Sequence, residues 1–458
     1  TTHWDWMTAQ GFAVAANSGN FNGVDASLWR QWFTAPDQLR QRVVLALSEI
    51  FVVSMTGVDG VFRGMSVAAY VDMLSARAFG SFRDLLEGVA LSPAMGVYLD
   101  MLGSRKATSS SQPDENFARE VMQLMTIGLV QLNVDGSAKV DASGTPIPTY
   151  QQDDVGNLAA VFTGWTYDGQ SSTDPACVAR PMVNVAANFS SGDKKVLDVS
   201  VPASLDGAGA MRLALDTLAN HANVGPFIGR QLIQRLVTSN PSPAYVKRVA
   251  QAFNDNGSGQ RGDMKAVVRA VLLDAEARIL DTGPGAGKLR EPVLRYIQWG
   301  RSFGLHSTSG AWNLIETSNP STKLGQSPLR SPSVFNFFRP GYVPPNSTMA
   351  VQKLTAPEFQ LCNEVTLASY LNFMQAQIAL TGDVTPDYSA QLALASDAAA
   401  LVRQVALLMA AGGLGDATLN TISSAVGKIS AASDAGRLNR VQAAIFLVMA
   451  SPEYLIQK

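Results

Sequence analysis

Apolar residues at helical spacing recur along almost the whole chain, and this pattern constrains the fold more than any other feature. After Thr34, an N-cap candidate, Leu39, Val43 and Leu47 form a stripe along one helix face. The same spacing predicts helices over 66–78, 81–91, 95–101, 114–128, 155–162, 210–219, 226–238, 244–254, 263–273 and 288–303, and about four more in 357–458. We therefore predict a mainly α-helical fold, an irregular array of about 15 or more helices.

Three segments depart from this pattern. Residues 129–140 carry extended-type residues on either side of Asp135-Gly136, which predicts a small β-hairpin. Residues 167–209 are rich in turns and contain short extended runs. Residues 318–345 are rich in Pro, Ser, Asn and aromatic residues, so we expect an ordered loop, because disordered segments contain few Phe and Tyr.

The domain organisation follows from length and from these breaks. With 458 residues and 47% apolar content, the chain has enough material for a large core. We predict a single large helical domain over 1–458, with a possible subdivision into an N-terminal helical part (1–165), an irregular insertion (166–209) and a C-terminal helical part (210–458). Thr149 and Gln152 fit a capping box for the last helix of the first part.

Composition argues against several kinds of partner. The formal net charge is −2 and only 16% of the residues are charged, so no clustered basic surface is available for nucleic acid. No run of about 18 apolar residues is present, so we predict no transmembrane segment. The chain has two cysteines, Cys177 and Cys362, and three histidines without paired spacing, which do not match a usual zinc site. A single disulfide between the two cysteines stays an open alternative. We predict neither a metal nor a cofactor.

The start of the chain bears on localisation. The sequence TTHWDWMTAQGF lacks the basic start and apolar core of a signal peptide, so we expect either a cytosolic protein or an exported one that is already processed. A weakly charged surface rich in Ser and Asn favours export.

A ridge of polar side chains borders the apolar face of the predicted helix 114–128. Asn116, Glu120 and Gln123 follow one edge of this helix at spacings of four and three residues. The wall of a pocket has this arrangement, in which Asn116 and Gln123 would bind substrate. Most polar residues beside a core face, however, contact water or a neighbouring helix. We predict a network that ties helices together, with an active site as the alternative.

The alternative has a definite chemistry. Glu120, paired with Asp153 or Asp154 from the next helix, would give the two carboxyl groups of a glycoside hydrolase. One acid would protonate the leaving oxygen while the other acted as base or nucleophile. The distance between the carboxyl groups decides whether such a pair works, and the sequence does not supply it.

Arginines and one indole complete the set of candidate site residues. Arg119, Arg230 and Arg235 could bind a carboxylate or sulfate through bidentate hydrogen bonds, and Arg230 shares a helix face with Gln234. Buried arginine–carboxylate pairs that tie helices together are the favoured interpretation, because buried charges must be paired. Trp165 is predicted to be a core indole, with sugar stacking as the alternative.

Five long motifs occur in one order: NFAREVMQLMTIG (116–128), YQQDDVGNLAAVFTGW (150–165), NVGPFIGRQLIQRLVTSNPSPAYVKRVAQAF (223–253), GKLREPVLR (287–295) and LGQSPLRSPSVFNFFRPGYVPP (324–345). Together they resemble the bacterial family called domain of unknown function 1800, and the resemblance spans almost the whole chain. It implies a mostly α-helical, exported protein that is often made beside an exported alkaline-phosphatase-like protein, which is therefore a candidate partner. It implies no established reaction.

This sequence departs from the family at histidine positions. Many members carry a histidine where Met125 stands, and others carry histidines in the region that here is ANFSSGDKKVLD (187–198), with Asn188 and Asp193 but no histidine. A histidine-dependent metal or acid–base role is therefore not expected in this chain.

Two hypotheses follow. The first is a secreted or periplasmic binding or structural protein that contacts an envelope polymer or a partner protein. The second is an extracellular hydrolase of a polysaccharide-like polymer that uses Glu120 and a nearby Asp with arginine assistance. We favour the first, because the region that departs from the family pattern is the one best suited to acid–base chemistry.

Overall fold

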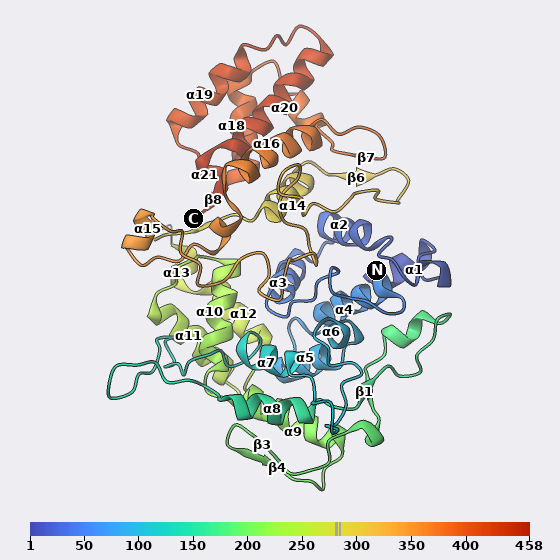
Figure 1. The fold of residues 1–458 in the computed structure, drawn as a ribbon. Helices are drawn as coiled ribbons and strands as arrows, with labels where there is room; N and C mark the ends of the chain where they lie inside the picture. Colours follow the sequence, from blue (N-terminus) through green and yellow to red (C-terminus); the bar gives the residue numbers. More distant parts are fainter. Residues whose placement is uncertain (280–282, 284) are drawn as a thin grey trace. The chain divides into compact units, whose positions relative to one another are not determined.

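The computed structural model describes residues 1–279, 283 and 285–458 and contains two compact units (Figure 1). Unit 1 comprises Thr1–Val24, Leu39–Leu280 and Ser331–Asn336, and unit 2 comprises Asp25–Gln38, Asp281–Arg330 and Phe337–Lys458. Across the described residues there are 21 α-helices and four two-stranded antiparallel sheets, which confirms the mainly α-helical class. The single domain over 1–458 stays a prediction.

Unit 1 contains most of the helices of the N-terminal half. They are α1 (His3–Ala9), α3 (Gln38–Ser48), α4 (Arg63–Arg77), α5 (Phe82–Ala90), α6 (Pro93–Tyr98), α7 (Asn116–Gln123), α8 (Gln152–Val161), α9 (Gly207–Asn220), α10 (Val224–Leu236), α11 (Pro243–Asn254), α12 (Met264–Leu273) and α13 (Ala275–Arg278). Short 3₁₀ turns are η1 (Ala15–Asn17), η2 (Pro175–Val178) and η3 (Ala186–Asn188). Strand β1 (Trp165–Thr166) pairs with β2 (Val183–Asn184), and β3 (Lys194–Val196) pairs with β4 (Val199–Val201).

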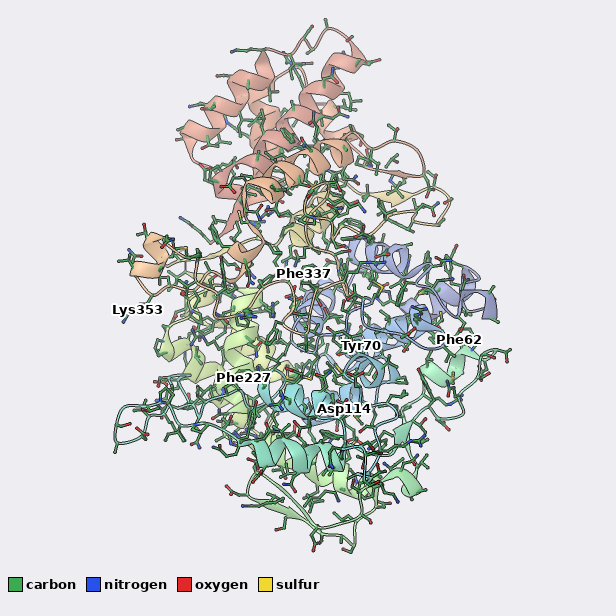
Figure 2. The ribbon with its side chains drawn as sticks, in the orientation of Figure 1. Phe62, Tyr70, Asp114, Phe227, Phe337 and Lys353 are labelled. Carbon is green, nitrogen blue, oxygen red and sulfur yellow. The ribbon has the colours of Figure 1, made fainter. Side chains whose placement is uncertain are left out.

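Side-chain caps explain where several of these helices begin. Ser81, Asp206 and Ser242 each accept a hydrogen bond from a backbone N–H in the first turn of the helix that follows. Apolar residues on the inner faces then pack around aromatic side chains. One of these is Tyr70 of α4, labelled in Figure 2, whose hydroxyl donates to the Phe51 carbonyl at 2.6 Å. Unit 1 therefore has a packed core of its own.

Unit 2 is built mainly from the C-terminal third of the chain. Its elements are α2 (Val24–Thr34), α14 (Pro292–Ser302), α15 (Thr348–Val351), α16 (Glu364–Ile378), α17 (Ser389–Leu392), α18 (Ala398–Ala410), α19 (Asp416–Gly427), α20 (Asp434–Ala450), α21 (Pro452–Leu455) and the 3₁₀ turn η4 (Pro357–Leu361). Helices α16, α18, α19 and α20 pack together (Figure 1). Strand β5 (Lys288–Leu289) pairs with β8 (Ile456–Gln457), and β6 (His306–Ser307) pairs with β7 (Val384–Thr385).

The structure corrects three local predictions. Thr34 is the last residue of α2, which the sequence analysis missed, and α3 begins only at Gln38. The capping box of α8 is formed by Gln151 and Asp154, because the Thr149 hydroxyl donates to the Gly128 carbonyl instead. The helix predicted over 288–303 begins at Pro292, since Lys288 and Leu289 form a strand.

Two further segments are shorter than predicted. The helix predicted over 114–128 spans only Asn116–Gln123. Around Asp135 the predicted hairpin is reduced to isolated β-bridges, among them one between Leu132 and Ala138. Cys177 and Cys362 are both free thiols.

Candidate functional site

Helix α8 of unit 1 packs between α7 and the hairpin of β3 and β4 (Figure 1). This arrangement brings three parts of the chain together that are far apart in sequence: the start of α7, the exposed side of α8 and residues 190–194 before and within β3. Lys195 N–H donates to Asn157 Oδ1 at 3.2 Å, and Leu197 N–H donates to Asp154 Oδ1 at 3.1 Å. Two side chains of α8 thus fix the hairpin against the helix.

An open hollow of about 510 Å³ lies where these parts meet. Its lining combines carboxylate, amide, hydroxyl and ammonium side chains with small residues and has no large apolar side chain. The lining residues are Glu115, Gln152, Asp153, Gly156, Asn157, Ala160, Ser190, Gly192, Asp193 and Lys194. Its volume lies in the range of small-ligand sites, and its many hydrogen-bonding groups suit a polar ligand.

The two aspartates of the YQQDD motif have different surroundings. Asp154 accepts hydrogen bonds from the Gln151 and Leu197 backbone N–H groups, so its carboxylate caps α8 and holds the hairpin. Asp153 is exposed and lines the hollow. Within the described residues its carboxylate is unpaired, since its hydrogen bond to Asn157 uses the backbone oxygen. Of the two, Asp153 is therefore the one available to a ligand.

Glu120 lies on α7 and is 8% exposed, and it does not line the hollow. Its Oε2 atom is buried without a hydrogen-bond partner in the described part of the chain. Burial raises the pKa of Glu120, and the neighbouring Arg119 guanidinium partly opposes that rise. Neither Asp153 nor Asp154 is among the causes of this pKa shift, so the pairing of Glu120 with an aspartate stays a prediction.

Two phenols share the electrostatic environment of Glu120. Burial raises the pKa of Tyr98 to about 12, a hydrogen bond with the Ser331 side chain lowers it and the Glu120 charge raises it. Tyr150 also has a raised pKa, from burial and from the same carboxylate. The Ser331 backbone oxygen accepts from Ser54 Oγ at 2.7 Å, so the segment 331–336 packs beside this cluster in unit 1. Glu120 is thus an interior acid next to phenols.

Two of the three candidate arginines, Arg119 and Arg235, join secondary-structure elements through hydrogen bonds and ion pairs. Arg119 donates to Glu115 Oε2 at 2.8 Å and to Gln152 Oε1 at 3.4 Å, which joins α7 to α8 at the rim of the hollow. Arg235 forms a buried ion pair with Glu49 at 2.7 Å, as favoured from the sequence. Arg230 is exposed and forms no hydrogen bond or ion pair with other described residues.

The remaining candidates lie outside the hollow. Asn116 donates to Asp100 Oδ2 at 3.0 Å, and Gln123 is half-buried at the end of α7. Gln234 is buried and donates to the Ser239 carbonyl at 3.0 Å. Trp165 is only 4% exposed, so its ring is a core indole without the open face that sugar stacking needs. Their roles in substrate binding stay predictions.

A second hollow, of about 440 Å³, is lined by residues of α11 and α12. Its acidic groups already have partners. Asp274 accepts two hydrogen bonds from Arg248, and Asp255 accepts from the Gly257 and Gly259 backbone N–H groups. The α8 hollow is the better candidate because Asp153 is unpaired there.

The chain belongs to the family described as Protein of unknown function (DUF1800), whose model matches residues 7–456. No curated protein and no solved structure matches it. None of the helices in the described residues is both long and apolar enough to cross a membrane. Over the same residues, no cluster of three or more His, Cys, Asp or Glu side chains is arranged to hold a metal ion.

Sequence reasoning found Asp153 but missed most of the hollow. Glu115, Asn157, Asp193 and Lys194 were not candidates, although Asn157 lies in the motif YQQDDVGNLAAVFTGW (150–165) and Asp193 and Lys194 lie in the segment where the chain departs from its family. The available signal was the helical spacing of Asp153 and Asn157, which places both on one face of α8.

Glu120 leads to a prediction about pH and stability. Because burial raises its folded-state pKa, the stabilisation is fully present below the ordinary value of 4.5 and is lost as the pH rises through the raised value. Glu120→Gln removes this titration. We expect the wild type to lose stability relative to the variant across that window, as measured by urea unfolding at a series of pH values. A difference that is constant with pH would contradict the assignment.

Proposed function

We propose that this protein is an exported binding protein, secreted or periplasmic, that holds a hydroxyl-rich polymer of the cell envelope in the α8 hollow. The observation that carries the proposal is the lining: an open space of about 510 Å³ surrounded by hydrogen-bonding side chains, with the unpaired Asp153 carboxylate among them. The sequence resemblance supports export.

The chemistry of the lining favours sugars over other ligands. Carboxylates and amide oxygens accept hydrogen bonds from hydroxyl groups, while the amides of Gln152 and Asn157 can also donate. Gly156 and Ala160 leave room for the flat C–H face of a sugar ring. Because large apolar side chains are absent from the lining, a lipid chain or an apolar peptide side chain would gain little by entering.

The charges of the residues that line the hollow indicate which sugars can bind there. Three carboxylates, of Glu115, Asp153 and Asp193, line the hollow together with the single ammonium of Lys194. Arg119 pairs with Glu115, so the carboxylates of Asp153 and Asp193 outnumber the remaining positive charge. We therefore expect neutral or amino sugars to bind and uronate or sulfated polymers to be excluded.

The test is binding to a panel of soluble polysaccharides and oligosaccharides, with dextran, xylan and chitosan oligomers on one side and alginate and heparin on the other. Asp153→Ala is expected to weaken binding of the neutral or amino members by about tenfold to a hundredfold, the cost of losing a hydrogen bond to a charged group. Isothermal titration calorimetry measures the change.

Asp416→Ala is the matched control, because Asp416 is also an exposed aspartate in the first turn of a helix, α19, and lies outside the hollow. It should bind as the wild type does. Binding of no neutral or amino member, or an equal loss in both variants, would overturn the proposal.

A hydrolase remains the second candidate, favoured by one observation. A general acid must keep its proton to a higher pH than an exposed carboxyl group does, and burial raises the pKa of Glu120 in that direction while its Oε2 atom has no hydrogen-bond partner among the described residues. This candidate predicts release of reducing ends from the same panel, lost in Glu120→Gln. Equal turnover by the two proteins would remove Glu120 from catalysis.

A further inference from the structure

Lys194, at the start of β3, differs from the other groups that line the hollow. The residue is 8% exposed, and its Nζ atom donates to the Gly192 carbonyl at 2.6 Å. The same atom lies 4.8 Å from the centre of the Phe189 ring. Among the described residues it forms no ion pair. An amine is thus held at the edge of an open hollow with a carbonyl and a ring, and without a carboxylate, as its partners.

The next residue provides a comparison within the same strand. Lys195 points to the other side of the hairpin, is 62% exposed in its side chain and lies 3.6 Å from Asp198. Exposure alone would make Lys195 the more reactive amine. Burial lowers the pKa of Lys194, although the Asp193 charge raises it in part. The fraction of Lys194 present as free amine is therefore larger than that of a lysine with the ordinary pKa.

We propose that Lys194 captures aldehydes or ketones that enter the hollow and forms an imine with them. This goes beyond the binding of a polymer and does not depend on it. The site supplies the parts that the reaction needs: a nucleophilic amine, space for a small carbonyl compound, and the carboxyl groups of Asp153 and Asp193 in the same lining.

The reaction balances without an oxidant or a reductant. The Nζ lone pair attacks the carbonyl carbon and forms a C–N bond, while the π electron pair of the carbonyl moves to its oxygen. A proton passes from nitrogen to this oxygen, for which Asp153 or Asp193 can serve as carrier, to give a carbinolamine. The nitrogen lone pair then forms the C=N bond as the C–O bond breaks, and the second N–H proton passes to the departing oxygen, which leaves as water.

The test is reductive labelling of the full chain. Propanal, which has no hydroxyl group, is added at neutral pH with sodium cyanoborohydride, whose hydride reduces any imine to a stable secondary amine. Peptide mass spectrometry then gives the labelling rate at each lysine. We expect Lys194 to react at least about fivefold faster than Lys195, because nucleophilicity follows the fraction of free amine more than exposure.

Labelling that follows exposure, with Lys195 ahead of Lys194, would overturn the proposal. Lys194→Arg keeps the positive charge and should abolish label at position 194 while leaving the rate at Lys195 unchanged. A changed rate at Lys195 would count against the proposal, because it would show that the substitution alters the conformation of the whole strand and that this conformation determines how fast its lysines react. Polymer binding can fail while Lys194 still reacts, so the two proposals are tested separately.

Discussion

Replacing Arg235 with methionine is expected to lower the free energy of unfolding of unit 1 by about 3–5 kcal/mol, the usual cost of leaving one member of a buried ion pair alone. Arg235 of α10 donates to Glu49 Oε2 at 2.7 Å and to the Glu49 backbone oxygen at 3.1 Å. Both side chains are 6% exposed. Methionine fills a similar volume but leaves the Glu49 carboxylate without this guanidinium.

Urea unfolding followed by circular dichroism measures the loss. Lys195→Met is the control, because the Lys195 and Asp198 side chains are 62% and 104% exposed at a separation of 3.6 Å. Exposed pairs contribute about 1 kcal/mol or less, so this variant should unfold almost as the wild type does. Similar losses in both variants would show that the Arg235 pair is not a buried tie.

The second large effect is expected in unit 2, at Lys288. Its Nζ atom lies 2.9 Å from Glu358 Oε1 and 3.7 Å from Glu291 Oε1, and the three side chains are 0–2% exposed. Gln326 also donates to Glu291 Oε2, at 2.7 Å. Lys288→Met removes the ammonium from between two buried carboxylates, so we expect unit 2 to lose at least about 3–5 kcal/mol.

Limited proteolysis and urea unfolding report this loss, with Lys428→Met as the control. Lys428 follows α19, is exposed and lies in the same unit, so its replacement should change stability by about 0.5 kcal/mol or less. If Lys288→Met were as stable as the control, the three buried charges could not be a structural network.

The sequence predicted the helices well where apolar spacing and a capping side chain agree. Helices α5 (Phe82–Ala90) and α11 (Pro243–Asn254) lie within one residue of the ranges 81–91 and 244–254 predicted for them, and a serine caps the start of each. Helix α2 was missed, although it carries the buried aromatic residues Trp29, Trp32 and Phe33. The α8 capping box was misplaced by two residues, because the tertiary hydrogen bond of Thr149 to Gly128 cannot be seen in local sequence.

The candidate site was predicted only in part, because its residues also come together through tertiary contacts that local sequence does not show. Sequence reasoning named Asp153 and Asp154 as alternative candidates but had no basis for separating them, because the role of Asp154 depends on the Leu197 N–H. Lys194 joins the hollow because a hairpin docks on α8. The register of that docking is a long-range property, which periodicity and composition do not encode.

Hydrogen–deuterium exchange of the full chain tests polymer binding in the hollow most directly, with and without a neutral or amino oligosaccharide at a concentration close to the Kd of the wild type. We predict slower exchange in two segments that are far apart in sequence, 152–160 and 190–195. The Asp153→Ala variant should show a much smaller change at the same concentration, because binding that is about tenfold to a hundredfold weaker leaves its hollow mostly empty. Protection confined to other segments, such as the aromatic loop 318–345, would contradict the account.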